Sequence, residues 1–238
     1  MSDTLAVVPA RRGSKGLPGK NLRTLVGIPL IEHSLRLAAL CPGIARTVVS
    51  TDSESIARVA RAAGADVLDR PVELAQDDTP MLPVLHHVLE QLDAAGDSYR
   101  FLLLLDPTSP GRLPEDVARA QEVLDARPDA DGVVSVSEPG FNPIWHAVVE
   151  RNGLIEQLLA EGRGYGRRQD VPRVLRINAA LYLWRTEFLL REKETWLNGR
   201  HVPLEIPELR AFHIDTEDDL RLCELVLDSG LVELPWLD

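Results

Sequence analysis

The sequence is poor in the features that mark several classes of protein. Its two cysteines, Cys41 and Cys223, lie far apart without a CxxC spacing, so we expect two reduced thiols. No apolar run reaches about 18 residues, and the N-terminus lacks the charge and apolar pattern of a secretory signal. We therefore expect a cytoplasmic protein that does not associate with membranes. A formal net charge of −11 argues against a nucleic-acid surface.

Acidic residues are missing from one stretch in particular. Residues 4–31 contain no Asp or Glu, although the whole chain has 37 of them. The same stretch holds five cations, which are Arg11, Arg12, Lys15, Lys20 and Arg23. A cationic island in an acidic protein predicts one small, highly anionic ligand.

Apolar patterns with strand and helix spacing alternate, with short links, as far as residue 137. Strands are predicted over 5–10, 45–51, 65–68, 99–107 and 131–137, and helices over 29–40, 53–64, 79–96 and 114–127. This alternation predicts an α/β protein with right-handed βαβ units and a mostly parallel sheet covered by helices. In such sheets ligands bind at the carboxyl ends of the strands, and the cationic stretch begins at the end of the first strand.

Residues 138–177 break this alternation, because they are rich in Gly, Pro and Arg. We expect one domain over 1–238, with 138–177 inserted as a lid or dimerisation arm. Beyond the arm the patterns predict strands over 178–184 and 210–215 and a final helix over 216–230. Thr216 and Asp219 have the spacing of a capping box at the start of this helix.

The loop over residues 11–21 has the ingredients of a phosphate-binding loop. Backbone N–H groups of a glycine-containing loop can cradle phosphate oxygens, Lys and Arg add charge, and Ser14 can donate a further hydrogen bond. The loop is neither a GxGxxG nor a Walker A motif, which would need Gly at 14 and Ser or Thr at 21. The alternative is an ordinary surface turn.

Five ordered segments resemble the signature of the acylneuraminate cytidylyltransferases, the CMP-N-acetylneuraminic acid synthetases. They are ARRGSKGLPGKN (10–21), VVSTDSESIARVARAAGADVLDRPVELAQDDTP (48–80), LLLLDPTSPGR (102–112), RRQDVPRVLRINAALYLW (167–184) and FHIDTEDDL (212–220). The resemblance implies a three-layer αβα, Rossmann-like fold with a twisted sheet, of the nucleotide-diphospho-sugar transferase type. It also implies Mg²⁺-dependent transfer of CMP from CTP to a sialic acid-like sugar acid, with release of pyrophosphate.

The resemblance assigns roles to individual residues. Those that would bind the nucleotide are Arg11, Ser14, Lys15, Lys20, Asn21, Arg70 and Asp106. Arg11, Lys15 and Lys20 would be catalytic, with Lys20 touching the α-phosphate. Those that would bind the acceptor are Arg168, Gln169 and Asn178. Without the resemblance, Arg70 could be a turn residue, Arg168 a solvated cation and Asn178 a capping group at a strand end.

Two departures from the family pattern concern the metal. The family ends its last strand with Asp-Ile-Asp, and both carboxylates are associated with Mg²⁺. Here the sequence reads His213-Ile214-Asp215, and His is a poor ligand for Mg²⁺, so Asp215 is the metal candidate at this position. Asp106 stands where the family has Gln. It could supply the missing carboxylate, or it could face the base or acceptor and change specificity.

Two further departures bear on the acceptor. Arg12 and Ala179 replace family glycines and could shrink the acceptor pocket. The alternatives that stay open are transfer of CMP to a small phosphonic acid in a natural-product pathway, guanylyl transfer on the same fold, and a non-catalytic nucleotide sensor. The expected partners are CTP, an anionic small-molecule acceptor and a second copy in a homodimer.

Overall fold

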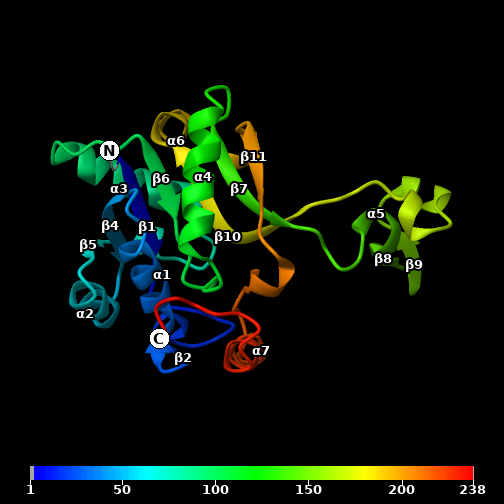
Figure 1. The fold of residues 1–238 in the computed structure, drawn as a ribbon, viewed down its shortest axis with the longest axis horizontal. Helices are drawn as coiled ribbons and strands as arrows, with labels where there is room; N and C mark the ends of the chain where they lie inside the picture. The colour runs from blue at the N-terminus through cyan, green and yellow to red at the C-terminus, as the bar shows by residue number, and fades with distance from the viewer. Residues whose placement is uncertain (1–2, 238) are drawn as a thin grey trace.

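A seven-stranded sheet forms the centre of the molecule in this computed structural model, which describes residues 3–237 (Figure 1). Its strands lie in the order β11 (His201–Glu205), β7 (Gly132–Ser137), β10 (Arg176–Arg185), β6 (Phe101–Leu104), β1 (Thr4–Pro9), β4 (Ile44–Thr51) and β5 (Asp66–Asp69). Within this sheet only β10 runs antiparallel to its neighbours. The predicted α/β fold with a mostly parallel sheet is confirmed.

Helices cover both faces of the sheet and make three layers. One face carries α1 (Leu30–Ala39), α2 (Glu54–Ala62), α4 (Pro114–Ala126) and α7 (Glu217–Asp228), and the other carries α3 (Met81–Ala94) and α6 (Thr186–Arg191). Side chains of β1 alternate between the layers: Ala6 and Val8 join the first core, whereas Leu5 and Val7 join the second. Among residues 3–237, no helix is long and apolar enough to cross a membrane.

Helix ends follow the sequence signals. At the start of α7, the Asp219 amide donates to Thr216 Oγ1 (3.2 Å) and the Thr216 amide donates to Asp219 Oδ2 (2.8 Å), which confirms the capping box. Gly64, Gly96 and Gly230 follow α2, α3 and α7 with φ of 81°, 86° and 72°. This left-handed conformation favours glycine and ends each helix.

The predicted strand over 210–215 is wrong, because the edge beside β7 is taken by β11. The chain then turns through η6 (Glu208–Arg210) and crosses the strand ends in an extended form. Ile214 is buried there, and its amide donates to Thr108 O (2.9 Å). The sequence pattern of β11 is weak because it contains Pro203, which an edge strand tolerates.

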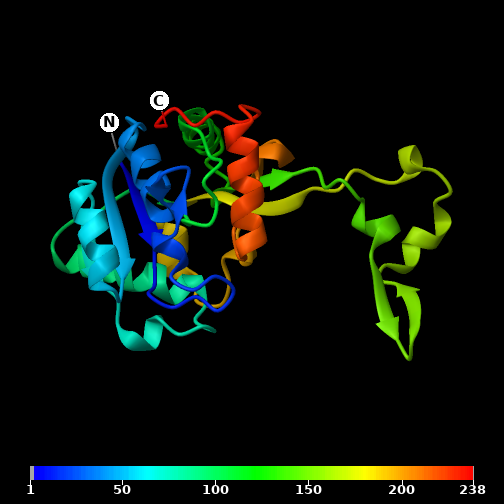
Figure 2. The ribbon, with the colours of Figure 1, turned by 90° about the horizontal axis from the view of Figure 1, so that it is seen from below.

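Residues 138–175 leave the sheet between β7 and β10 and project to one side (Figures 1 and 2). This arm contains α5 (Pro143–His146), the hairpin of β8 (Val148–Arg151) and β9 (Leu154–Gln157), η3 (Ala160–Gly164) and η4 (Arg168–Asp170). Several large apolar side chains are left in water, with Phe141 77%, Leu154 72% and Ile155 76% exposed.

Candidate active site

A cavity of about 170 Å³ lies where the loop after β1 meets the segments that follow β5 and β6. It brings together six of the predicted nucleotide-binding residues, which are Arg11, Ser14, Lys20, Asn21, Arg70 and Asp106. Lys15 does not line the cavity, but its ammonium contacts Asp77, which does. The residues predicted to bind the nucleotide therefore lie close together in the structure.

Three cations of the loop, Arg11, Lys15 and Lys20, are paired with carboxylates. Asp77 contacts both Arg11 and Lys15, with Lys15 Nζ 2.8 Å from its Oδ2. Hydrogen bonds from Lys15 and Arg11 hold the pKa of Asp77 below its usual value. Lys20 Nζ lies 2.7 Å from Asp215 Oδ1. The cations that would bind phosphate oxygens are thus already paired with groups of negative charge.

Contacts outside the charged groups give the loop its shape. Asn21 Nδ2 donates to Arg11 O (2.9 Å), and the Arg12 amide donates to Asp52 Oδ1 (2.7 Å). A Cβ on Gly16 would lie 2.4 Å from the backbone oxygen of Asp215, so only glycine permits this approach. Asn21 therefore braces the loop here, and its direct contact with a nucleotide stays a prediction.

Arg70 is a cation fixed in place before any ligand arrives. It is 7% exposed, and its guanidinium donates to Ser50 O (2.7 Å) and Ser50 Oγ (3.1 Å). Burial lowers the pKa of Arg70 to about 10, so it is still charged at neutral pH. Its place in the cavity wall favours contact with a ligand over the turn-residue alternative.

The two metal candidates have different surroundings. Asp106 lines the cavity, and its Oδ1 accepts from the amide and hydroxyl of Thr108, both at 3.0 Å. Asp215 lies outside the cavity lining, between Lys20 and His213, whose Nε2 is 3.0 Å from Asp215 Oδ2. Partial burial would raise the pKa of Asp215, but Lys20 and His213 bring it below its usual value, so it is ionised at neutral pH.

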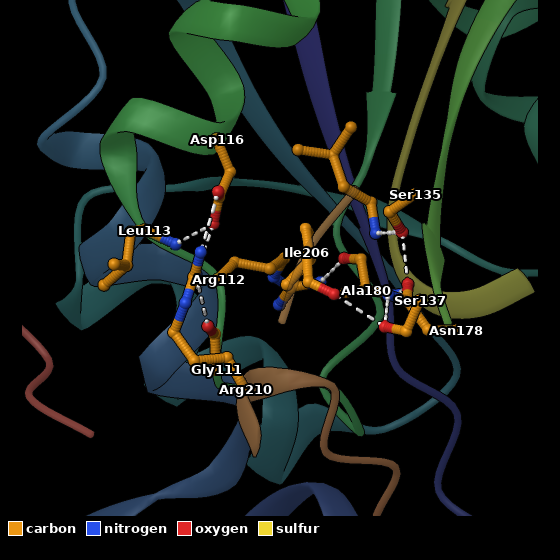
Figure 3. A network of polar contacts seen from close by, with 11 residues as sticks. Gly111, Arg112, Leu113, Asp116, Ser135, Ser137, Asn178, Ala180, Ile206 and Arg210 are labelled. Carbon is orange, nitrogen blue, oxygen red and sulfur yellow. Dashed lines mark hydrogen bonds and ion pairs between the residues drawn. The ribbon is translucent and has the colours of Figure 1, made fainter. Parts of the chain in front are cut away.

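The predicted acceptor residues are not gathered at this cavity within one chain. Asn178 is 1% exposed, and its amide bonds to Ser135 Oγ (2.6 Å) and Ser137 Oγ (2.8 Å) on β7 (Figure 3). Its polar atoms hold β10 against β7, which gives no support to a direct acceptor contact. Arg168 and Gln169 lie in the arm, where they line a separate cavity of about 230 Å³.

A second polar cluster, which the sequence analysis missed, lies outside the cavity and is largely buried (Figure 3). We call Arg112, Asp116, Asn178 and Arg210 the buried network. Arg112 donates to Ala180 O (3.0 Å) and Ser34 Oγ (2.6 Å), and Arg210 pairs with Asp116 (2.5 Å). The pairs of Arg112 with Ala180, Arg210 with Asp116 and Asp77 with Lys15 have no local sequence signal, because each joins distant parts of the chain.

The fold and the loop are those of a nucleotidyltransferase, an enzyme that transfers a nucleotidyl group. The chain belongs to the cytidylyltransferase family, whose model matches residues 5–195. The resemblance found in the sequence is confirmed.

Curated relatives cover most of the chain. A Legionella pneumophila protein named CMP-N,N'-diacetyllegionaminic acid synthase is 33% identical, over 94% of this chain and 96% of its own length. A Campylobacter coli protein named post-translational flagellin modification protein B is 28% identical over 95% and 96%. N-acylneuraminate cytidylyltransferase of Streptococcus agalactiae is 32% identical over 90% of this chain, which spans about half (51%) of that protein.

Solved structures match the fold. A CMP:2-keto-3-deoxy-manno-octonic acid synthetase complexed with CTP superposes with a TM-score of 0.73 at 19% identity, covering 96% of this chain and 100% of that one. A 4-diphosphocytidyl-2C-methyl-D-erythritol synthase gives a TM-score of 0.68 at 16% identity, covering 96% and 100%.

Proposed function

We propose that the protein transfers CMP from CTP to a sugar acid of the sialic or legionaminic acid type and releases pyrophosphate. The observation that carries the proposal is the cavity that gathers Arg11, Ser14, Lys20 and Arg70 at the end of β1. The names of the Legionella and Streptococcus relatives, which refer to diacetyllegionaminic acid and to N-acylneuraminate, support the class of acceptor.

The chemistry follows from where the cations lie. A hydroxyl oxygen of the acceptor attacks the α-phosphorus in line, its bond to phosphorus forms, and the bond to the pyrophosphate oxygen breaks. The hydroxyl proton is released to solvent. Negative charge grows on the leaving oxygens. Arg11 and Lys15 bind the outer phosphates in place of Asp77, and Lys20 faces the α-phosphate. Fixed cations stabilise the growing charge without reorganising during the reaction.

Mg²⁺ is part of the proposal, and the residues present fit it. Asp215 offers an ionised oxygen ligand beside the loop, and Mg²⁺ in nucleotide sites often takes only one or two carboxylates together with substrate phosphates. Within residues 3–237, no group of three or more His, Cys, Asp or Glu forms a metal cage, which agrees with such an open site. Bound Mg²⁺ would neutralise charge on the phosphates.

The contribution of Asp106 to Mg²⁺ binding can be measured separately from that of Asp215. If Asp106 replaces the missing carboxylate, Asp106→Ala raises the Mg²⁺ concentration for half-maximal activity, as Asp215→Ala does. If Asp106 instead faces the base or acceptor, Asp106→Ala changes the KM of one substrate and leaves the Mg²⁺ dependence unaltered. The measurement is the rate as a function of Mg²⁺ for both variants.

We also infer that the arm joins two copies into a homodimer. Its exposed Phe141, Leu154 and Ile155 are side chains that a partner would cover. In a dimer, Arg168 and Gln169 of one copy would lie near the acceptor at the other copy's cavity. Within their own chain they line a separate cavity in the arm. Light scattering of the wild type and of Ile155→Asp tests this: a dimer that becomes a monomer supports it, and a wild-type monomer refutes it.

The reaction is tested by pyrophosphate release from each of the four nucleoside triphosphates with Mg²⁺. The acceptors are N-acetylneuraminate, other nonulosonic acids and small phosphonic acids. Turnover only with CTP and a sugar acid supports the proposal. Turnover only with a phosphonic acid or only with GTP replaces it. CTP binding without turnover on any acceptor favours a nucleotide sensor.

A further inference from the structure

Asp77 is a charged residue of the candidate site to which the sequence analysis assigns no role, and the proposed reaction displaces it from its two cations. It lies between η2 (Val72–Leu74) and α3, and it lines the cavity together with residues of the loop after β1. Its two carboxylate oxygens face different cations, with Oδ1 on Arg11 and Oδ2 on Lys15. Arg11 also donates to Ala75 O (3.5 Å), so the loop and this segment meet at several atoms.

The contacts of Asp77 are of a kind that a ligand can replace. The side chain of Asp77 is 37% exposed and that of Lys15 is 83% exposed. Exposed ion pairs contribute little to stability, so little is lost when they open. A triphosphate brings several charged oxygens to the same two cations and forms stronger, partly desolvated contacts.

Asp77 also cannot stay where it is once the outer phosphates bind. Its carboxylate would share Arg11 and Lys15 with phosphate oxygens, and like charges at such distances repel. Because Asp77 lines the cavity, phosphates bound there would lie next to its carboxylate and be repelled by it.

Resting on the proposed function, we propose that Asp77 is an internal anion that competes with the outer phosphates for Arg11 and Lys15. It weakens the binding of CTP and speeds the release of pyrophosphate by returning to both cations. Asp77 touches no reacting atom, so it is a positioning residue that sets affinity for the phosphate chain.

The test compares Asp77→Asn with Asp78→Asn, an exposed neighbour that does not line the cavity and whose replacement gives the same change in net charge. Calorimetry measures the Kd of CTP and of pyrophosphate for both variants and the wild type. We expect Asp77→Asn to bind both ligands about three- to tenfold more tightly, since two exposed ion pairs no longer compete. Asp78→Asn should stay within about twofold.

A Lys15→Met background shows whether the effect passes through the loop. There the gain from Asp77→Asn should shrink, because one of the two contested cations is gone. Unchanged or weaker binding by Asp77→Asn, or an equal gain in Asp78→Asn, overturns the inference. Failure of the wild type to bind CTP at all would instead refute the proposed function, so the two failures are distinguishable.

Discussion

Arginines in two parts of this molecule have different surroundings and different partners. At the candidate site, Arg11 is 27% exposed in its side chain and pairs with a carboxylate on another segment. In the buried network, Arg112 is 1% exposed and donates to a backbone oxygen of β10 and to Ser34 on α1. Both follow a strand in a segment that resembles a family motif.

The difference lies in whether the partner can be replaced. Carboxylates at the cavity can be exchanged for phosphate, so the cations there are available to a ligand. A buried carbonyl oxygen cannot replace a lost hydrogen bond with one from water, so the cation that donates to it stays in place. Burial also lowers the pKa of Arg112 to about 10, because its charge is far from solvent. Exposure and partner type, more than residue type, separate binding from structural cations here.

The largest expected effect is on activity at the cavity. Lys20→Met should lower kcat/KM by at least about 100-fold, because it removes a fixed cation from the developing charge. The free energy of unfolding should change by less than about 1 kcal/mol, since one ion pair is lost. Steady-state kinetics and urea unfolding measure the two effects. Lys193→Met, at an exposed lysine, is the control, and activity within threefold of wild type in Lys20→Met would contradict the assignment.

The opposite pattern is expected in the buried network. Arg112→Met should lower the free energy of unfolding by about 3 kcal/mol, because it leaves Ala180 O and Ser34 Oγ buried without this donor. Urea unfolding measures the loss, and Arg119→Met on the exposed face of α4 is the matched control. A loss below about 1 kcal/mol would mean that the buried contacts do not lock the fold as described.

Next in size is an effect of pH on stability. His33 is 1% exposed, its Nε2 faces Leu25 O (3.1 Å), and its Nδ1 accepts from Trp236 Nε1 (3.1 Å). Burial lowers the pKa of His33 to about 4, whereas in the unfolded chain it stays near 6.5. The unfolded state therefore binds a proton first as pH falls, so stability is full above about pH 6.5 and declines toward pH 4.

The contribution of His33 should be up to about 3 kcal/mol over that interval. Urea unfolding at several pH values measures it, and His33→Gln should flatten this part of the curve. His146→Gln, at an exposed histidine, should leave the slope as it is. Equal slopes for the wild type and His33→Gln would show that other groups cause the decline.

The smallest effect concerns a backbone position. Ala179 has φ of 59° in the irregular part of β10. Ala179→Gly should stabilise the protein by about 0.5–1 kcal/mol, because Ala is strained at positive φ. Thermal unfolding measures the gain. Ala118→Gly, inside α4, should instead destabilise the protein by about 1 kcal/mol, because Gly has a lower helix propensity than Ala. A loss of stability in Ala179→Gly would contradict the strain.

The sequence patterns predicted the layered fold and singled out the loop after β1, because both depend on residues that are close together in the sequence. The continuous apolar run at 101–105 predicts a strand buried on both faces, and its side chains do divide between the two cores. The patterns failed at 210–215, where apolar Phe212 and Ile214 fit a strand but the neighbouring edge was already taken. They also could not show that Asn178 faces Ser135 and Ser137 or that Asp77 faces Lys15, because those partners are set by packing between distant segments.

A crystal structure of the protein with CTP and Mg²⁺ tests the central claim most directly. The account predicts phosphate oxygens within hydrogen-bond distance of Arg11, Lys15 and Lys20, with Asp77 withdrawn from both of its cations and Arg112 unchanged. CTP bound with its phosphates away from the loop, or with Asp77 still on Arg11 and Lys15, would contradict it.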